Sequence, residues 1–117
     1  MRAEKKAWIA AVVDCEGSLS VIKLKEPRTK RGFSYRAQLQ VTNTDPALIQ
    51  HFRDLVSAGS INKIPELRFQ WADKWQYTGN SNCIRKLLPQ ILPYLIVKKR
   101  VGEKMLAFLN LINHGLR

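Results

Sequence analysis

The sequence is poor in cysteine, acidic residues and long apolar runs, and each shortage excludes a class of protein. Its two cysteines, Cys15 and Cys83, are too few and too far apart to indicate a disulfide framework or a zinc site. Reduced thiols are typical of a cytosol-like compartment. No apolar run approaches the roughly 20 residues of a membrane-spanning helix, and the charged N-terminus has no secretory core. We therefore expect a soluble, intracellular protein (cytoplasm, nucleoid or organelle matrix) without a membrane partner.

Negative charge is the second shortage. Asp and Glu number 9 against 20 Lys and Arg, so the formal charge is +11. Such an excess attracts phosphate backbones or anionic surfaces in a salt-dependent way. With 117 residues, 45% of them hydrophobic, and three Trp, the chain predicts one folded domain over residues 1–117. A basic protein without catalysis, such as a ribosome-associated protein or an RNA chaperone, stays open at this point.

An apolar helix is predicted over residues 3–14, and it ends near two carboxylates, Asp14 and Glu16, with Gly17 as its terminator. Residues at i, i+3, i+4 and i+7 are neighbours on a helix. Small residues on one such face permit the close approach of a second helix at an interface, although burial against a sheet is the alternative. The members of this face are Ala7, Ala10, Ala11 and Asp14.

Carboxylates where a helix stops are suited to holding a divalent cation. Mg²⁺ favours carboxylate and carbonyl oxygens, retained waters and substrate phosphate. Because a helix end leaves backbone carbonyls unpaired, the Cys15 carbonyl is available beside Glu16, with Asp14 as a possible further ligand. Such a metal polarises a phosphodiester and activates water. In a cationic protein this indicates chemistry on a nucleic acid; a polar helix end that satisfies nearby amides is the alternative.

Two hairpins are expected further along the chain. Apolar and polar residues alternate in each strand, but the parity changes at Ile22 and Leu24, which indicates either a bulge or a strand that projects beyond the core. The strands fall at about residues 18–25, 35–41, 60–64 and 67–78.

Helices are predicted between and after these hairpins. Asp45 before Pro46 indicates a helix N-terminus, and Gly59 closes that helix. Ser81 is the expected cap of a further helix, which Pro89 interrupts. The last helix follows Pro93, with Val97, Val101, Met105, Phe108, Leu109 and Ile112 on its buried side.

This order predicts an α+β fold, with an antiparallel sheet covered by helices on one face. In a major groove, Gln side chains pair with adenine edges and Arg with guanine edges. A plain solvated face would look similar, but an Arg-x-Gln pattern on both hairpins favours base readout. The cations and amides expected on the uncovered face are Arg36, Gln38, Gln40, Arg68, Gln70, Lys74 and Gln76.

Residues 8–18, Trp-Ile-Ala-Ala-Val-Val-Asp-Cys-Glu-Gly-Ser, resemble the signature of the LAGLIDADG homing endonucleases. The order of elements over almost the whole chain resembles one domain of that family. The resemblance implies an αββαββα fold with a saddle-shaped sheet in the major groove of double-stranded DNA. It also implies that the signature helices pack at a two-fold axis, so a chain with one motif forms a homodimer. The activity implied is metal-dependent, site-specific cleavage of a long pseudo-palindromic duplex.

Site residues carry over position by position. Glu16 matches the metal-binding acid, where Asp is commoner, and Asp14 the earlier acid; Ala11 stands where Gly is frequent. Asn43 matches a residue that orders water, and Lys98 a cation that activates water or stabilises charge, although Lys98-Lys99-Arg100 also suits phosphate contact. The implied cofactor is Mg²⁺ or Mn²⁺, with Ca²⁺ binding without turnover. Further DNA contacts are expected at Ser20, Lys25, Arg28, Lys30 and Arg31. A non-cleaving intron maturase or DNA-binding regulator is the alternative.

Overall fold

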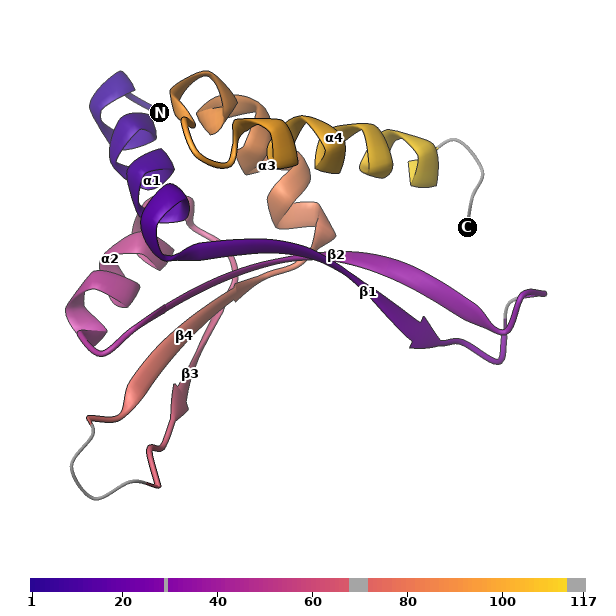
Figure 1. Ribbon diagram of the computed structural model, residues 1–117, viewed down its shortest axis with the longest axis horizontal. Helices are drawn as coiled ribbons and strands as arrows, with labels where there is room; N and C mark the ends of the chain where they lie inside the picture. The colour runs from indigo at the N-terminus through magenta and orange to yellow at the C-terminus, as the bar shows by residue number, and fades with distance from the viewer. Residues whose placement is uncertain (29, 68–71, 114–117) are drawn as a thin grey trace.

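A four-stranded antiparallel sheet carries helices on one of its faces in the computed structural model (Figure 1). The structure describes residues 1–28, 30–67 and 72–113. The strand order is β1-β2-β4-β3, so the two hairpins meet where β2 pairs with β4. This arrangement confirms the predicted α+β fold. Its elements are α1 (Ala3–Glu16), β1 (Gly17–Lys25), β2 (Phe33–Asn43), α2 (Pro46–Val56), β3 (Ser60–Ile64), β4 (Lys74–Gly79), α3 (Ser81–Ile91), the 3₁₀ turn η1 (Leu92–Tyr94) and α4 (Lys99–Asn113).

The core lies between the sheet and the helices that cover it. Tyr77 of β4 is fully buried there, and its hydroxyl donates to the Ala58 carbonyl at 2.8 Å. Gly59 lies against the same ring, where a Cβ would approach the ring to 2.4 Å. Other fully buried side chains come from α1, β2 and three helices packed on them: Ile9, Val13, Val41, Ile49, Phe52, Ile84, Ile91 and Leu109. None of the helices in the described ranges combines the length and apolar character that crossing a bilayer requires.

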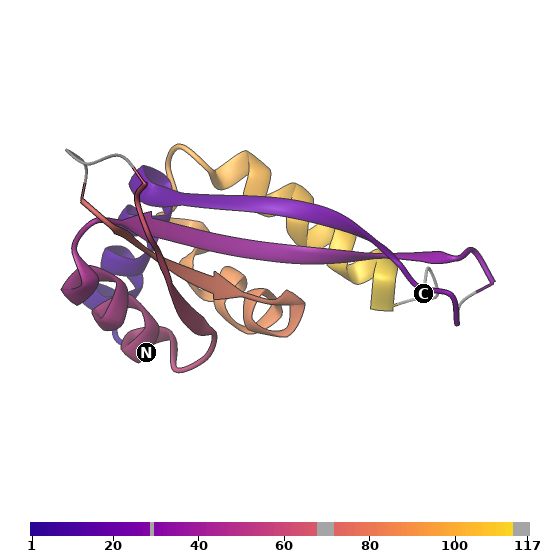
Figure 2. The ribbon, with the colours of Figure 1, turned by 90° about the horizontal axis from the view of Figure 1, so that it is seen from below.

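The β1–β2 hairpin pairs without a bulge. Its register runs unbroken from Gly17 opposite Val41 to Lys25 opposite Phe33. The parity change at Ile22 therefore arises because the strands continue past the core, and the hairpin extends beyond the end of α4 (Figures 1 and 2). Ile22 lies across from Arg36, on the face without helices.

The helix starting near residue 81 differs from the prediction at both ends. Asn80 is its cap, with a side chain that accepts from the Cys83 amide at 3.0 Å, whereas the Ser81 hydroxyl accepts from the Ala37 amide at 3.0 Å. Ser81 thus ties α3 to β2 where pairing with β4 stops. Pro89 lies inside α3 rather than ending it. Continuing the helix buries Ile91 (1% exposed), which offsets the lost backbone hydrogen bond.

Two residues assigned to the buried side of the last helix are in fact exposed. Val97 is 74% exposed and Val101 44% exposed, whereas Met105 and Leu109 are buried as predicted. The chain from residue 95 to 98 is held by Asp14 of α1 and is not yet helical, so the buried stripe starts one turn later than the apolar pattern indicated.

Candidate functional site

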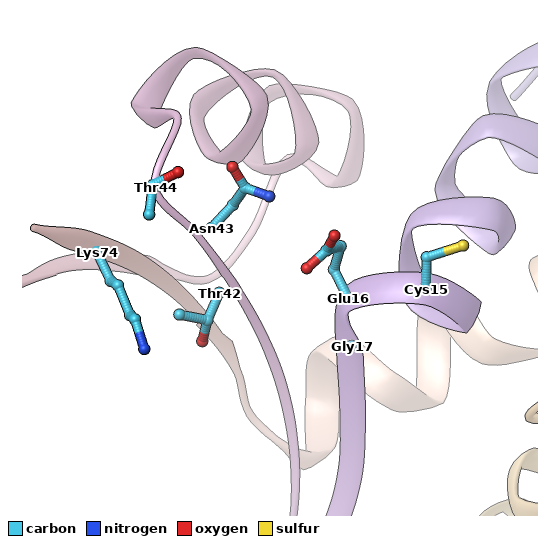
Figure 3. A pocket seen from close by; sticks show the side chains of 7 residues that line it. All are labelled: Cys15, Glu16, Gly17, Thr42, Asn43, Thr44 and Lys74. Atoms are coloured by element: carbon cyan, nitrogen blue, oxygen red, sulfur yellow. The ribbon is translucent and has the colours of Figure 1, made fainter. Parts of the chain in front are cut away.

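A pocket of about 460 Å³ opens where α1 meets the sheet (Figure 3). Glu16, at the end of α1, lies on one side of it, and Lys74 of β4 lies on the other, with the end of β2 between them. Its lining residues are Cys15, Glu16, Gly17, Thr42, Asn43, Thr44 and Lys74. Glu16 and Asn43, which the family resemblance implies for one site, thus line the same pocket, and Lys74 lines it with them.

Gly17 is required where α1 turns into β1. A Cβ at this position would lie 2.8 Å from the carbonyl oxygen and 2.9 Å from the Cα of Val13. The backbone dihedrals are ordinary extended values (φ −93°, ψ 161°), so space, not conformation, demands glycine. Because the strand leaves the helix this tightly, the carboxylate of Glu16 is displayed at the sheet edge.

The two carboxylates of the motif have different environments. Both oxygens of Asp14 accept backbone hydrogen bonds, from Ile96 at 2.8 Å and from Lys98 at 2.9 Å. Burial tends to raise the pKa of Asp14, but the amides of Ile96, Lys98 and Val97 and the charge of Lys98 outweigh it and lower this pKa. Glu16 is exposed, and within the described residues no group donates a hydrogen bond to it. Asp14 is thus committed to structure, and Glu16 is free for a ligand.

Lys98 lies beside the pocket rather than among its lining residues. Its ammonium donates to the backbone carbonyl of Asp14 at 2.7 Å, and its own carbonyl accepts from Gly102 at 2.8 Å, which opens α4. The last turn of α1 has no basic residue of its own. Lys98 therefore supplies the positive charge that a helix C-terminus favours.

Asn43 is held in one orientation. Its Oδ1 accepts from the Asp45 amide at 2.8 Å, and Asp45 in turn caps α2 by accepting from the Ala47 amide at 2.9 Å. The amide nitrogen of Asn43 consequently lies on the side of Glu16 (Figure 3). A donor fixed in this way is suited to orienting a water or a phosphate oxygen in the pocket.

The residues that line the pocket fit a metal ion whose remaining ligands are phosphate oxygens and water. No group of three or more His, Cys, Asp or Glu side chains that could hold a metal occurs in the described part of the chain. Mg²⁺ is commonly bound through one or two carboxylates plus phosphate oxygens and water rather than by a full protein cage. Glu16 offers one carboxylate, and the Cys15 carbonyl at the helix end is a further oxygen; Asp14 has both oxygens occupied.

The face of the sheet opposite the helices carries hydrogen-bonded polar side chains of β2 and β4. Gln40 donates to Gln76 at 3.4 Å, and Gln76 donates to Thr42 at 3.3 Å across β2 and β4. By strand register this face also carries several of the side chains for which the sequence predicted DNA contacts. They are Ser20, Arg36, Gln38, Gln40, Lys74 and Gln76.

Other predicted contact residues lie elsewhere. Lys25 pairs with Phe33 on the same side of the hairpin as the buried residues of β2, so its side chain lies on the face opposite Gln38 and Gln40, and its DNA contact stays a prediction. Arg28 and Lys30 are exposed in the turn of the hairpin, and Arg31 lies 5.9 Å from the Phe33 ring. Arg68 and Gln70 lie outside the described residues.

The alanine stripe of α1 divides between two environments. Ala7 and Ala11 are exposed, so they are accessible to a partner helix. Ala10 is fully buried inside the chain, so its assignment to an interface is wrong. The helix is apolar on most sides, and its spacing alone does not distinguish the face that packs on the sheet.

Thr42 and Thr44 also line the pocket, although no sequence pattern marks them, and none connects Lys74 with Glu16. Thr42 is paired with Gln76, and Lys74 lies two residues before Gln76 in β4, on the same face of the sheet. Only the pairing of β2 with β4 brings them to the pocket, and no local pattern encodes that pairing.

No protein-family model and no curated protein matches this sequence. Solved structures do match. The homing endonuclease I-TnaI has a TM-score of 0.80 at 19% identity, over 94% of this chain and 74% of its own. I-CvuI in complex with the I-CreI target has a TM-score of 0.77 at 19% identity, over 92% of this chain and 66% of its own. The LAGLIDADG homing endonuclease I-LtrWI bound to target DNA has a TM-score of 0.76 at 22% identity, over 94% of this chain.

These similarities establish the fold. The chain spans 66% of I-CvuI and 37% of I-LtrWI, so it covers less than two thirds of their length. The resemblance read from residues 8–18 is thereby confirmed at the level of the fold.

Proposed function

We propose that this chain, which has the LAGLIDADG homing-endonuclease fold, is a site-specific DNA endonuclease. Two copies bind a long, roughly palindromic duplex and hydrolyse one phosphodiester in each strand across the minor groove, leaving short 3′ overhangs. One observation carries the proposal: the unbonded carboxylate of Glu16 faces a pocket at the edge of an open, polar sheet face in a protein of charge +11.

Double-stranded DNA is the substrate that this sheet face favours. Arg36, Gln38 and Gln40 lie on the uncovered side of β2, and a two-stranded ribbon of this kind fits a major groove. The net positive charge adds the salt-dependent attraction to phosphates. The exposed cations of the hairpin turn, Arg28 and Lys30, extend this contact along the backbone.

Glu16 and the Cys15 carbonyl would hold a divalent metal, Mg²⁺ or Mn²⁺, together with substrate phosphate, and Ca²⁺ would bind there without turnover. Bound Mg²⁺ or Mn²⁺ would polarise the phosphodiester and lower the pKa of the attacking water. Asn43 orients a water or phosphate oxygen through its fixed amide. Lys98 and Lys74 contribute positive charge beside the reacting phosphate, the first from the start of α4, where its ammonium contacts the end of α1, and the second from the pocket wall.

A homodimer with two-fold symmetry completes the site, since one motif supplies one metal-binding acid. The exposed alanines of α1, Ala7 and Ala11, permit the close helix contact that such a dimer needs. A longer protein in which a second domain takes the role of the partner copy would build the same pair of pockets.

The alternative is a non-cleaving binder of the same fold, an intron maturase or a DNA-binding regulator. The hydrogen bond from the Lys98 ammonium to the Asp14 carbonyl favours this alternative, because an ammonium that holds the backbone in place is less available for catalysis. The two functions share the sheet face and differ only in catalysis.

Selection of bound and cleaved duplexes from a randomised library, with Mg²⁺, Ca²⁺ or no divalent ion, tests the proposal. We expect a defined palindromic site that is bound in all three conditions and cut only with Mg²⁺. A defined site that is bound and never cut would establish the non-cleaving binder. Binding without any sequence preference would contradict both.

A further inference from the structure

Two apolar side chains lie on the open face of β1. The register sets Ile22 opposite Arg36 and Leu24 opposite Ser34, on the side of the sheet that carries Gln38 and Gln40. Both are partly exposed, whereas Lys23 between them is exposed on the other side, with its ammonium 4.1 Å from the Phe33 ring centroid. The apolar residues thus face the polar side, and the lysines face away from it.

The core does not account for this pattern. β1 is an edge strand whose partner in the sheet is β2, and the end of the hairpin extends past α4 (Figures 1 and 2). No helix of the described residues covers the open face at Ile22 or Leu24. Had the hairpin served only as a solvated arm, the lysines at 23 and 25 would suit that face better.

We infer that Ile22 and Leu24 recognise the 5-methyl groups of thymines in the outer part of each half-site. This inference rests on the proposed function and names the bases that the site must contain. Among the groups exposed in a major groove, the thymine methyl is the apolar one. Arg36 lies directly across from Ile22 and supplies a hydrogen-bond donor for a neighbouring base.

The spacing of the two side chains fixes the spacing of the thymines. Two residues along a strand advance about 6.6–6.8 Å, which matches two base steps of about 3.4 Å each. Ile22 and Leu24 therefore contact base pairs about two steps apart. Leu24, which is farther from α1, reads the outer of the two.

Deoxyuridine tests this directly, since it differs from thymidine only in lacking the methyl group. In a duplex selected with the unmodified protein, each thymine is replaced singly by deoxyuridine, and the dissociation constant is measured in Ca²⁺. We expect two positions per half-site, about two base pairs apart, where the replacement weakens binding about three- to fivefold. Ile22→Ala abolishes the effect at the inner position and Leu24→Ala at the outer one.

Val21→Ala is the matched control, because Val21 is an exposed apolar residue of the same strand on its other face. It should leave both deoxyuridine effects intact. Tight binding of a defined duplex with no deoxyuridine effect, or with effects that persist in both open-face variants, would overturn the inference while leaving the proposed function standing. Failure to bind any defined duplex would overturn both.

Discussion

The ammonium of Lys98 donates to the backbone carbonyl of Asp14 at 2.7 Å, while the carboxylate of Asp14 accepts from the backbone amide of Lys98 at 2.9 Å. The two residues are 84 positions apart in sequence, and their reciprocal contact joins the end of α1 to the start of α4. The first acid of the motif therefore organises the structure around the site, and the second acid, Glu16, is left to meet a ligand.

Asp14→Asn should destabilise the protein at neutral pH by about 1–2 kcal/mol, because Asn keeps one acceptor oxygen and sets an NH2 group, which cannot accept, against the amide of either Ile96 or Lys98. The native state lowers the pKa of Asp14, so its stabilisation is complete above the unfolded-state value and is lost as the pH falls through the lower native value. The difference from the unmodified protein should thus shrink below about pH 4. Urea unfolding at a series of pH values measures it.

Glu103→Gln provides the control for that series, since Glu103 is an exposed carboxylate on α4. Its stability should follow that of the unmodified protein at each pH. An Asp14→Asn deficit that stays constant into acid would show that the carboxylate charge is not what holds the Ile96–Lys98 segment.

Glu16→Gln should retain site-specific binding and reduce Mg²⁺-dependent cleavage by about 10³-fold or more, because several kcal/mol of transition-state stabilisation depend on the metal. The substitution preserves shape and removes only the charge of a side chain that is exposed. Cleavage of the selected duplex under single-turnover conditions measures the rate, and a gel-shift titration in Ca²⁺ measures binding. A variant that still cuts at the original rate would refute Glu16 as the metal-binding acid.

The helix and strand order could be predicted from the sequence because each element carries its own period and boundary signals. Asp45 and Pro46 start α2 as expected, with the Asp45 side chain accepting from Ala47. Gly17 likewise marks the end of α1, although the helix runs two residues further than predicted, to Glu16. Local signals of this kind do not depend on the rest of the fold.

What could not be predicted depends on contacts between distant segments. Pro89 normally stops a helix, but burial of Ile91 in the core outweighs that preference. The burial of Ala10 depends on which side of α1 meets the sheet. Lys74 joins the pocket because β4 pairs with β2, and this pairing is set by the packing of both hairpins under the helices.

Lys74→Gln should lower the cleavage rate at saturating DNA about tenfold and reduce the slope of log affinity against log salt by about one phosphate contact. Its side chain shares the pocket with Glu16, so under the proposed function its charge would act close to the scissile phosphate as well as in binding. Lys86→Gln, an exposed lysine on α3, is the charge-matched control and should change neither quantity. Equal losses in both variants would indicate that Lys74 contributes only general charge.

Ala11→Leu should weaken self-association at least tenfold. An exposed alanine on α1 permits two helix backbones to approach closely, and a larger side chain in such a contact costs about 1–3 kcal/mol. Sedimentation velocity over a concentration series measures the dimer dissociation constant, and circular dichroism checks that the chain stays folded. Ala107→Leu, at an exposed position of α4, adds the same volume away from α1 and should leave association unchanged. An unaltered dimer in Ala11→Leu would mean that the copies meet through another surface, and the two Glu16 pockets would then not lie side by side beneath one duplex.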